Sequence, residues 1–275
     1  MRDLLLFENQ LPFDILVKLF DMTKDSNQQS ASDSIVDLAL STLAKWVPSF
    51  GNLPPSKIPP KNVDHLLGLL HDTWCSSFAE IVSFRENICA SYKSKWSTIK
   101  CATELREAGI KFKKATANGP LFDIKFEKGI MTIPPLEIDD STEWFFRNMI
   151  AYEQYNQGTE PTYVTDYVIF IDYLIDSPKD VKILCDCGVI DNFLGDDTMI
   201  SNMFNKMTNH VNTSPTRFCY RNVFIDVNEH CGHHWNTWMA DLRHNYFNTP
   251  WSIISVVCAF ILMVFAMIQA IWSIL

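Results

Sequence analysis

Residues 251–275 read WSIISVVCAFILMVFAMIQAIWSIL, a stretch without a single Asp, Glu, Lys, Arg or His. As a helix rising ~1.5 Å per residue it reaches roughly 37 Å, enough to cross a hydrocarbon core of about 30 Å with some tilt. Trp251 and Trp272 would stand roughly 32 Å apart, where the aromatic belts of a bilayer lie. A buried core helix is the alternative, but core helices are usually shorter and keep a polar face. The sequence predicts one transmembrane helix at 251–273.

The other end of the chain bears on orientation. The apolar run that follows Arg2 and Asp3 stops at Glu8 and is too short for the core of a signal peptide. Eight cysteines are scattered singly, and Cys258 lies inside the predicted span, so they do not resemble a disulfide framework. We therefore expect a C-terminally anchored membrane protein with residues 1–248 in the cytosol. The sequence favours neither the plasma membrane nor an endomembrane.

Composition limits the classes of partner. The hydrophobic content of 47% and the aromatic content of 13% are typical of a chain with a packed core, not of a disordered one. The formal net charge is −9, whereas binding to a nucleic-acid backbone needs a basic surface. We expect the lipid bilayer and another protein as partners, and no nucleic acid.

Hydrophobic spacing predicts a mainly α (α+β) fold, a multi-helix domain over 1–248. The segment 47–62 carries five prolines and reads as a linker. Segment 73–94 reads as a long loop or a weakly formed helix. Three short strands at 110–114, 121–127 and 130–133 predict a small antiparallel β-meander at about 110–133. Helices are expected at 13–20, 33–46, 64–70, 98–108 (closed by Gly109), 144–155 (behind a capping box, Asp140 to Glu143), 163–176, 178–187, 196–209 and from 216 onward.

Four blocks of sequence carry a family resemblance. Residues 3–12, DLLLFENQLP, resemble the LLLENQLP signature of a plant family catalogued as domain of unknown function 247. Three blocks follow in the family's order, ATELREAGIKF at 102–112, FRNMIAYEQ at 146–154 and YFNTPW at 246–251. The resemblance covers essentially the whole chain. It implies a plant membrane protein with one C-terminal span and no established enzymatic activity; a recognition role is proposed for some grass members at self-incompatibility loci.

The family also implies a longer chain. Its members usually carry a long segment before the ENQLP block, including a Gly-Pro-Tyr-His-His motif, which this sequence lacks. The chain therefore resembles an N-terminally truncated member. We expect apolar faces that pack against that segment in the family to be exposed here.

Thiols and imidazoles near the C-terminal third suggest a zinc site, because zinc takes four such ligands in a tetrahedron. The spacing does not match common structural sites, since Cys185 and Cys187 are separated by one residue and no second pair follows. No Glu stands between His230 and His234 as it does in a zincin. We expect no bound metal and no cofactor. The candidate ligands are Cys185, Cys187, Cys219, His230, Cys231, His233 and His234.

Carboxylates offer a second reading as an enzyme. Glu153 lies among Ile150, Tyr152 and Tyr155, and an apolar setting can raise the pKa of a general acid. The alternative is a buried, hydrogen-bonded helical residue, which we favour. The cluster Glu137, Asp139, Asp140 and Glu143 reads better as a helix start with favourable charge. Neither a Gly-x-Ser-x-Gly elbow nor a Gly-rich phosphate loop is present, so we expect no catalytic residues.

Small residues recur along one stripe of the predicted span. Ser255 and Ala259, like Ala266 and Ala270, are four apart, the spacing that lets two helices approach closely in lipid. Gln269 beside them can add a hydrogen bond across the contact, for roughly 1 kcal/mol. The stripe predicts a face for self-association.

Together these features predict a single-pass plant membrane protein that acts as a protein-interaction or recognition module. A membrane-associated, hydrolase-like enzyme of unrecognised type is the alternative, and a non-functional fragment is a third possibility.

Overall fold

The computed structural model of the chain describes residues 2–23, 34–43, 47, 63–89, 97–116, 119–156, 161–211 and 217–232, together with positions 255, 258, 261–263, 265 and 269. Of the predicted linker at 47–62, only Val47 is described, and its side chain is buried. The rest of the linker lies outside the described residues.

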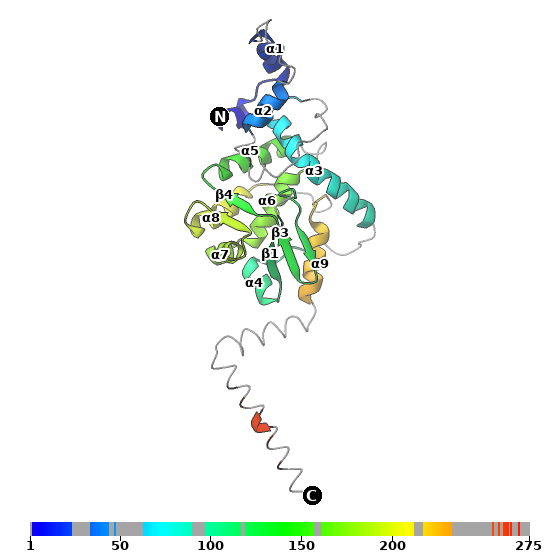
Figure 1. The fold of residues 1–275 in the computed structure, drawn as a ribbon, viewed down its shortest axis with the longest axis vertical. Coiled ribbons are helices and arrows are strands. Elements are labelled where there is room, and N and C mark those ends of the chain that lie inside the picture. Colours follow the sequence, from blue (N-terminus) through cyan, green and yellow to red (C-terminus); the bar gives the residue numbers. More distant parts are fainter. Residues whose placement is uncertain are drawn as a thin grey trace.

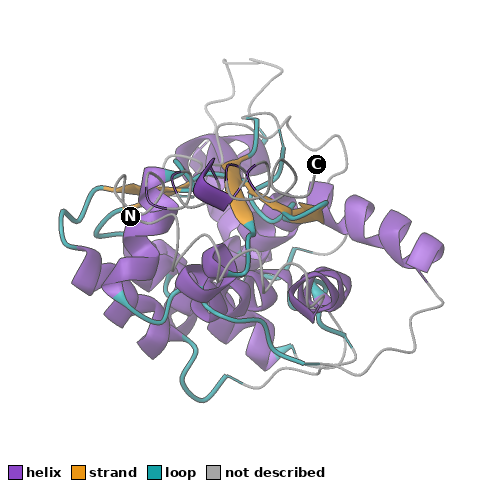
Figure 2. Cartoon of the chain, turned by 90° about the horizontal axis from the view of Figure 1, so that it is seen from below, coloured by secondary structure: helices purple, strands orange, loops and turns teal. Residues whose placement is uncertain are grey.

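Helices make up most of the described chain (Figure 2). The mainly α (α+β) prediction is confirmed, with small mixed sheets in place of a meander. Two short 3-10 helices, η1 Arg2–Leu5 and η2 Phe7–Asn9, come first. The α-helices are α1 Phe13–Thr23, α2 Ile35–Leu43, α3 Leu66–Cys89, α4 Ala102–Glu107, α5 Thr142–Tyr155, α6 Tyr163–Leu174, α7 Pro178–Asp186, α8 Asp197–Met207 and α9 Arg221–Gly232; the strands are β1 Lys111–Lys114, β2 Lys125–Glu127, β3 Ile130–Ile133, β4 Leu136–Ile138 and β5 Ile190–Asn192.

The prediction of an antiparallel meander is wrong. The three-stranded sheet has the order β1-β3-β2, with β1 parallel and β2 antiparallel to β3. A parallel pair needs a crossover between its strands, and the connection from β1 provides it. That connection is held in the core by Leu121, Phe122 and Ile124, so only the last three residues of the predicted second strand pair with β3.

A second sheet, formed by β4 and β5, was not predicted from the sequence. These two strands pair in parallel, Leu136 opposite Ile190 and Ile138 opposite Asn192. Each strand has three residues, too few for an alternating pattern to stand out. They are more than fifty residues apart, so only the packed fold brings them together.

The long helix α3 corrects the prediction for 64–94. A short helix at 64–70 was expected, followed by a long loop or a weakly formed helix at 73–94. The structure has one helix of 24 residues, Leu66–Cys89, and residues 90–94 lie outside the described part. The polar residues of this segment are compatible with a helix, because their hydroxyl groups can donate to carbonyls within it. The Thr73 hydroxyl, for example, donates to the Leu69 carbonyl. A seam at helical spacing, Leu67, Leu70, Trp74, Phe78 and Val82, is buried along one side.

Aromatic rings fill the centre of the core. The Trp74 ring lies edge-on to Phe122 and Phe145, with ring centroids 4.6 and 5.3 Å apart. Tyr167 on α6 meets the other side of Phe122, with centroids at 5.3 Å. Edge-on packing of this kind adds roughly 0.5–1.5 kcal/mol per pair beyond the area buried. The cluster joins α3, α5 and α6 into one framework.

Hydrogen bonds from side chains mark the starts of several helices, but not always at the residues that the sequence spacing predicted. The predicted capping box from Asp140 to Glu143 is wrong, because Asp139 accepts from the amide and hydroxyl of Ser141 instead. A capping box does begin α7, between Ser177 and Asp180. The predicted helix stop at Gly109 is confirmed by its φ of +90°.

The ENQLP block acts as a clasp between the N-terminus and α3. Gln10 donates to the carbonyls of Leu4 and Leu6 and accepts from the Leu67 amide, an N–H at the start of α3. Asn148 on α5 accepts from the Phe7 amide at 2.7 Å. Figure 1 shows the result: α1 and α2 lie together at one end of the molecule, beyond the upper part of α3 and away from the sheets.

The predicted span lies largely outside the described residues. Of 251–273, positions 255, 258, 261–263, 265 and 269 are described, and each is helical and exposed. A search of the described helices finds none with both the length and the apolar character needed to cross a membrane.

Candidate functional site

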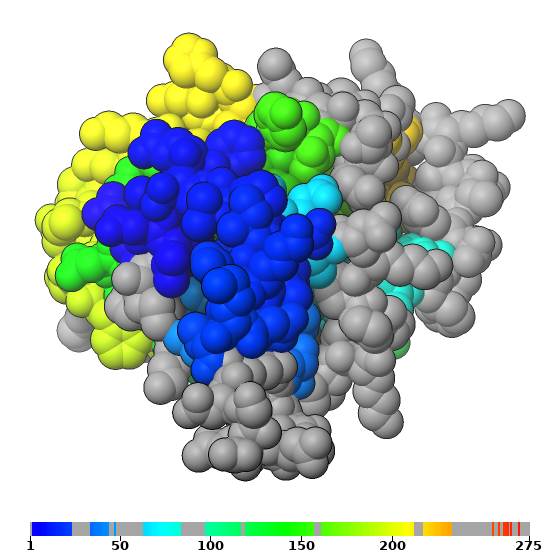
Figure 3. Space-filling model, turned by 90° about the horizontal axis from the view of Figure 1, so that it is seen from above, coloured from blue at the N-terminus to red at the C-terminus, as the bar shows by residue number. Residues whose placement is uncertain are grey.

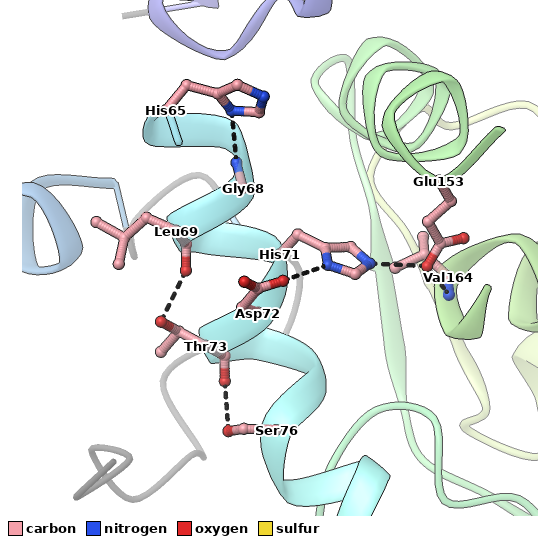
Figure 4. Close-up of polar contacts among 9 residues, drawn as sticks. All are labelled: His65, Gly68, Leu69, His71, Asp72, Thr73, Ser76, Glu153 and Val164. Carbon is pink, nitrogen blue, oxygen red and sulfur yellow. Dashed lines mark hydrogen bonds and ion pairs between the residues drawn. The ribbon is translucent and has the colours of Figure 1, made fainter. Parts of the chain in front are cut away.

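A polar cluster lies buried between α3 and α5. His71 and Cys75 are one helical turn apart on α3, and both side chains are within the core. Glu153 reaches towards them from α5, and its side chain is 2% exposed. Figure 4 shows the His71 ring pointing from α3 directly at the Glu153 carboxylate. We refer to His71, Cys75 and Glu153 as the buried cluster.

Glu153 caps the start of α6. One carboxylate oxygen, Oε1, accepts from the Val164 amide at 2.9 Å, and Oε2 accepts from the Thr165 amide at 2.7 Å and from its hydroxyl. The first amides of a helix have no partner within it and carry a partial positive charge. The carboxylate therefore accepts hydrogen bonds from these amides and also interacts favourably with the partial positive charge at the start of α6. Glu153 is a buried, hydrogen-bonded helical residue, as we favoured from the sequence.

His71 bridges two carboxylates. Its Nε2 lies 2.8 Å from Glu153 Oε1, and its Nδ1 lies 3.0 Å from Asp72 Oδ1. Burial disfavours the charged imidazolium, but the adjacent sulfur and the two carboxylates favour it more and raise the pKa of His71 well above its ordinary value. The pair with Glu153 is thus an ion pair inside the core. Asp72 is half exposed, so the Nδ1 side of the ring faces towards the surface.

Cys75 completes the cluster. Burial raises the pKa of its thiol, and the neighbouring His71 opposes that shift. One ligand atom from each of His71, Cys75 and Glu153 lies within 4.8 Å of the other two. Within the described part of the chain, no other set of three such groups meets that condition.

A second buried carboxylate stands beside the cluster on α6. Asp166 accepts from the Cys219 amide at 2.8 Å and from the Thr162 hydroxyl at 3.3 Å. Burial raises the pKa of Asp166 to about 7, the hydrogen bonds from Cys219 and Thr162 oppose the shift, and the charge of Glu153 adds to it. Burial together with Asp166 also raises the pKa of the Cys219 thiol. The core therefore holds more acidic groups than basic ones.

Among the described residues, the zinc ligands considered from the sequence do not come together as a group. Cys185 lies in α7 and Cys187 at its end, whereas Cys219 adjoins Asp166. His230 packs edge-on against Phe126, with ring centroids 5.6 Å apart. Cys231 follows in α9, and His233 and His234 lie outside the described residues.

The acidic group at 137–143 serves the start of α5. Burial alone would raise the pKa of Asp139, but the hydrogen bonds from Ser141 and Thr142 lower it below its ordinary value. Glu143 pairs with Arg147, four residues further along α5, at 2.9 Å. These contacts order the turn that leads into α5.

An apolar surface covers the opposite pole from the sheets. Ile15, Leu19 and Met22 are spaced by four and three residues along α1, and Met22 is 82% exposed. Leu4, Leu11 and Leu38 are exposed on the neighbouring elements. Figure 3 looks onto this pole and shows residues of η1, η2, α1 and α2 as one continuous region. We name these six residues the N-terminal apolar face.

Acidic side chains outnumber basic ones on the segments that carry this face. In the described residues 2–23 and 34–43, the exposed side chains include five acidic and two basic ones, an excess of three negative charges. One of the two basic groups, Arg2, lies over the Trp144 ring at 5.8 Å. The acidic side chains are Asp3, Glu8, Asp14, Asp21 and Asp37.

Sequence reasoning singled out Glu153 but missed its partners. His71 and Cys75 have the four-residue spacing that places two ligands on one helical face. That signal required segment 73–94 to be recognised as helix, which its many polar residues obscured.

The residues of the predicted self-association face are only partly described. Ser255 and Gln269 are helical and exposed, whereas Ala259, Ala266 and Ala270 lie outside the described residues. The self-association face stays a prediction.

Comparison with known proteins gives a family match. A model described as a plant protein of unknown function, domain of unknown function 247, matches residues 1–265. The chain is 27% identical to a UPF0481 protein of Arabidopsis thaliana over 288 residues, covering 99% of this chain and 59% of that protein. A second UPF0481 protein of that plant is 30% identical over 174 residues, covering 62% of this chain and 32% of that protein. The chain thus spans about three fifths and one third of these relatives. No solved structure matches it.

Proposed function

This chain belongs to the plant family catalogued as domain of unknown function 247, and on that premise we propose that it is a membrane-tethered protein-interaction module. Its N-terminal apolar face binds a helix of another protein, and its C-terminal segment holds it at a bilayer. The family is of unknown function, so the proposal is argued from the surface and the sequence of this chain.

The observation that carries the proposal is the N-terminal apolar face. Its six large side chains are between 46% and 82% exposed and lie on neighbouring elements. Contiguous apolar patches on folded proteins are often binding sites. Burying one such side chain fully contributes about 1.5–3 kcal/mol, so covering even part of this face favours a complex.

The shape and charge of the face favour a helical partner with basic flanks. Ile15, Leu19 and Met22 repeat at the spacing that a partner helix recognises when it packs lengthwise. The excess of acidic side chains on these segments attracts Lys and Arg and disfavours an acidic partner. We therefore assign the face to an amphipathic helix with an apolar stripe bordered by basic residues.

The tether rests on the charge-free stretch at 251–273. The described positions in it include Leu262, Met263 and Phe265, each 59–68% exposed. Transfer of such apolar side chains from water into the hydrocarbon core of a bilayer is favourable. Self-association through Ser255, Ala259, Ala266, Gln269 and Ala270 is part of the proposal, and substituting Ala259 and Ala266 with Leu should lower the signal of a membrane dimerisation reporter.

A defined peptide tests the binding face. The full-length protein in detergent micelles is titrated with a labelled amphipathic helix bearing Lys flanks, and with a version carrying Glu in place of each Lys. We expect the basic peptide to bind. Leu19→Asp should weaken it more than tenfold, equal to about 1.4 kcal/mol, and Asp14→Lys should weaken it less. The control Lys182→Asp alters an exposed residue on α7.

Several results would contradict the proposal. Equal binding of the two peptides would show that the acidic side chains do not select a basic partner. Binding that survives Leu19→Asp would show that the peptide does not bind at the N-terminal apolar face. If the same substitution instead abolishes dimer formation or binding to neutral lipid vesicles, the face belongs to a second copy or to lipid rather than to a partner helix.

A further inference from the structure

We propose that His71, Cys75 and Glu153 form a binding site for a divalent transition metal ion, with Zn²⁺ as the best match. The site joins α3 to α5 and, through Glu153, to the start of α6. It is distinct from the cysteine and histidine set suggested by the sequence, and it is separate from the proposed binding face.

The donor types fit zinc. A thiolate, an imidazole and a carboxylate are all common ligands of this ion, and three protein ligands leave a fourth position for a water molecule. Mg²⁺ and Ca²⁺ prefer sites built from oxygen alone, so a set with sulfur and nitrogen selects against them.

The geometry requires a small adjustment. In a tetrahedral zinc site, nitrogen and oxygen ligands lie about 3.3 Å apart. His71 Nε2 and Glu153 Oε1 are 2.8 Å apart, so they would separate by about half an ångström. The Cys75 sulfur already lies within 4.8 Å of one ring nitrogen of His71 and one carboxylate oxygen of Glu153. His71 and Cys75 share one face of α3, so side-chain rotation brings the ligands together without moving a helix.

Neighbouring groups already orient two of the ligands. Thr165 holds Oε2 of Glu153 through its amide and hydroxyl, which leaves Oε1 directed at His71. Asp72 lies 3.0 Å from His71 Nδ1, the nitrogen that remains when Nε2 binds a metal. A histidine ligand almost always donates its other N–H in this way, frequently to a carboxylate.

The charges of the ligands match a divalent cation, because a carboxylate and a thiolate would supply two negative charges. Glu153, Asp166 and the Cys75 thiol are all buried, and His71 is the basic group among them. On binding, Zn²⁺ would take the place of the proton between His71 and Glu153 and of the thiol proton of Cys75. Two protons would leave for solvent, so zinc affinity should rise with pH.

Metal content and cobalt spectra test the site. The full-length protein in detergent is stripped with a chelator, loaded with Zn²⁺ or Co²⁺, and desalted. We expect one metal ion per chain, a thiolate-to-cobalt absorption band, and a higher melting temperature with metal. Cys75→Ser should abolish the band, and Asp72→Asn should weaken zinc binding by about 10–100-fold. Cys219→Ser changes a partly buried thiol outside the group and is the matched control.

Two outcomes would overturn the site. The first is a wild-type protein that melts cooperatively yet keeps no metal after desalting and gains no stability from zinc. The second is a cobalt band that persists in Cys75→Ser and disappears in Cys219→Ser. If Cys75→Ser fails to fold, His71→Gln supplies the second variant: it keeps a hydrogen-bond donor near Glu153 but lacks the imidazole ligand, so zinc must no longer raise its melting temperature.

Discussion

Two oxygen atoms of Glu153 hold three parts of the molecule together: α5, the start of α6 and the middle of α3. Each oxygen accepts hydrogen bonds from groups that are themselves buried. Removing the carboxylate would leave the His71 charge and two helix amides without their acceptor. Removing one partner of a buried ion pair is strongly destabilising, because it leaves the other charge buried and uncompensated.

We therefore predict that Glu153→Ala lowers the free energy of unfolding by about 3–5 kcal/mol. Urea denaturation of the detergent-solubilised protein measures this change. Glu143→Ala on the same helix is the control, because its exposed pair with Arg147 is worth about 0.5 kcal/mol or less. Equal effects of the two substitutions would show that the buried cluster is not important for stability.

Asp166 predicts how stability depends on pH. Its pKa is about 7 in the folded protein, raised mainly by burial, against about 3.9 in an unfolded chain. Between these values the folded state binds the extra proton, so the free energy of unfolding falls as pH rises from about 4 to 7. The raised pKa of His71 acts in the same direction, because its contribution is complete below about pH 6.5 and is lost at higher pH.

The metal-free wild-type protein, kept in a chelator, should therefore melt at a higher temperature at pH 6 than at pH 8. Asp166→Asn keeps the shape of the side chain but cannot ionise, so its melting temperature should vary less across that range. Scans of both proteins at matched ionic strength check this expectation. A wild-type protein that gains stability towards pH 8 would contradict it.

At the scale of elements, the clasp formed by Gln10 ties the N-terminus to α3. Its side chain makes three hydrogen bonds to backbone groups of Leu4, Leu6 and Leu67. We predict that Gln10→Ala speeds hydrogen exchange at the Leu67 amide and lowers stability by about 1–3 kcal/mol. Asn9→Ala is the control, because Asn9 makes one exposed bond to the Asp3 carbonyl. Unchanged hydrogen exchange at the Leu67 amide would show that the Gln10 side chain does not hold the N-terminus against α3.

Local signals explain which elements the sequence predicted. Gly109 ends α4 because its backbone adopts a positive φ, and the ends of α7 carry a capping box and Gly188. Signals that need distant residues failed. The parallel pair of β4 with β5 joins segments more than fifty residues apart, and α3 is defined by a buried seam that its polar residues hide.

The candidate site divides in the same way. Glu153 was recognisable from its apolar neighbours on one helix, whereas its contact with His71 spans 82 residues of sequence. The position of Cys75 beside them depends on α3 continuing past Thr73. The residues of the N-terminal apolar face were not predicted, because which apolar side chains of α1 stay exposed depends on how the helix packs.

For the whole molecule, the proposed arrangement separates two tasks. A framework of α3, α5 and α6 holds the buried cluster, and the N-terminal apolar face lies at the pole remote from the sheets (Figure 1). The C-terminal segment would place this framework at a membrane. Binding and tethering then involve different parts of the chain, so each can be altered alone.

Extraction of membranes with alkaline carbonate tests the tether most directly. The full-length chain, expressed in plant cells, should remain in the membrane pellet. A variant with Leu262→Asp and Phe265→Asp should move to the supernatant, because a charged side chain costs about 2.5–3.5 kcal/mol at the centre of a span. Recovery of the wild-type chain in the carbonate supernatant would contradict the account, since its C-terminal segment would then not be embedded in lipid.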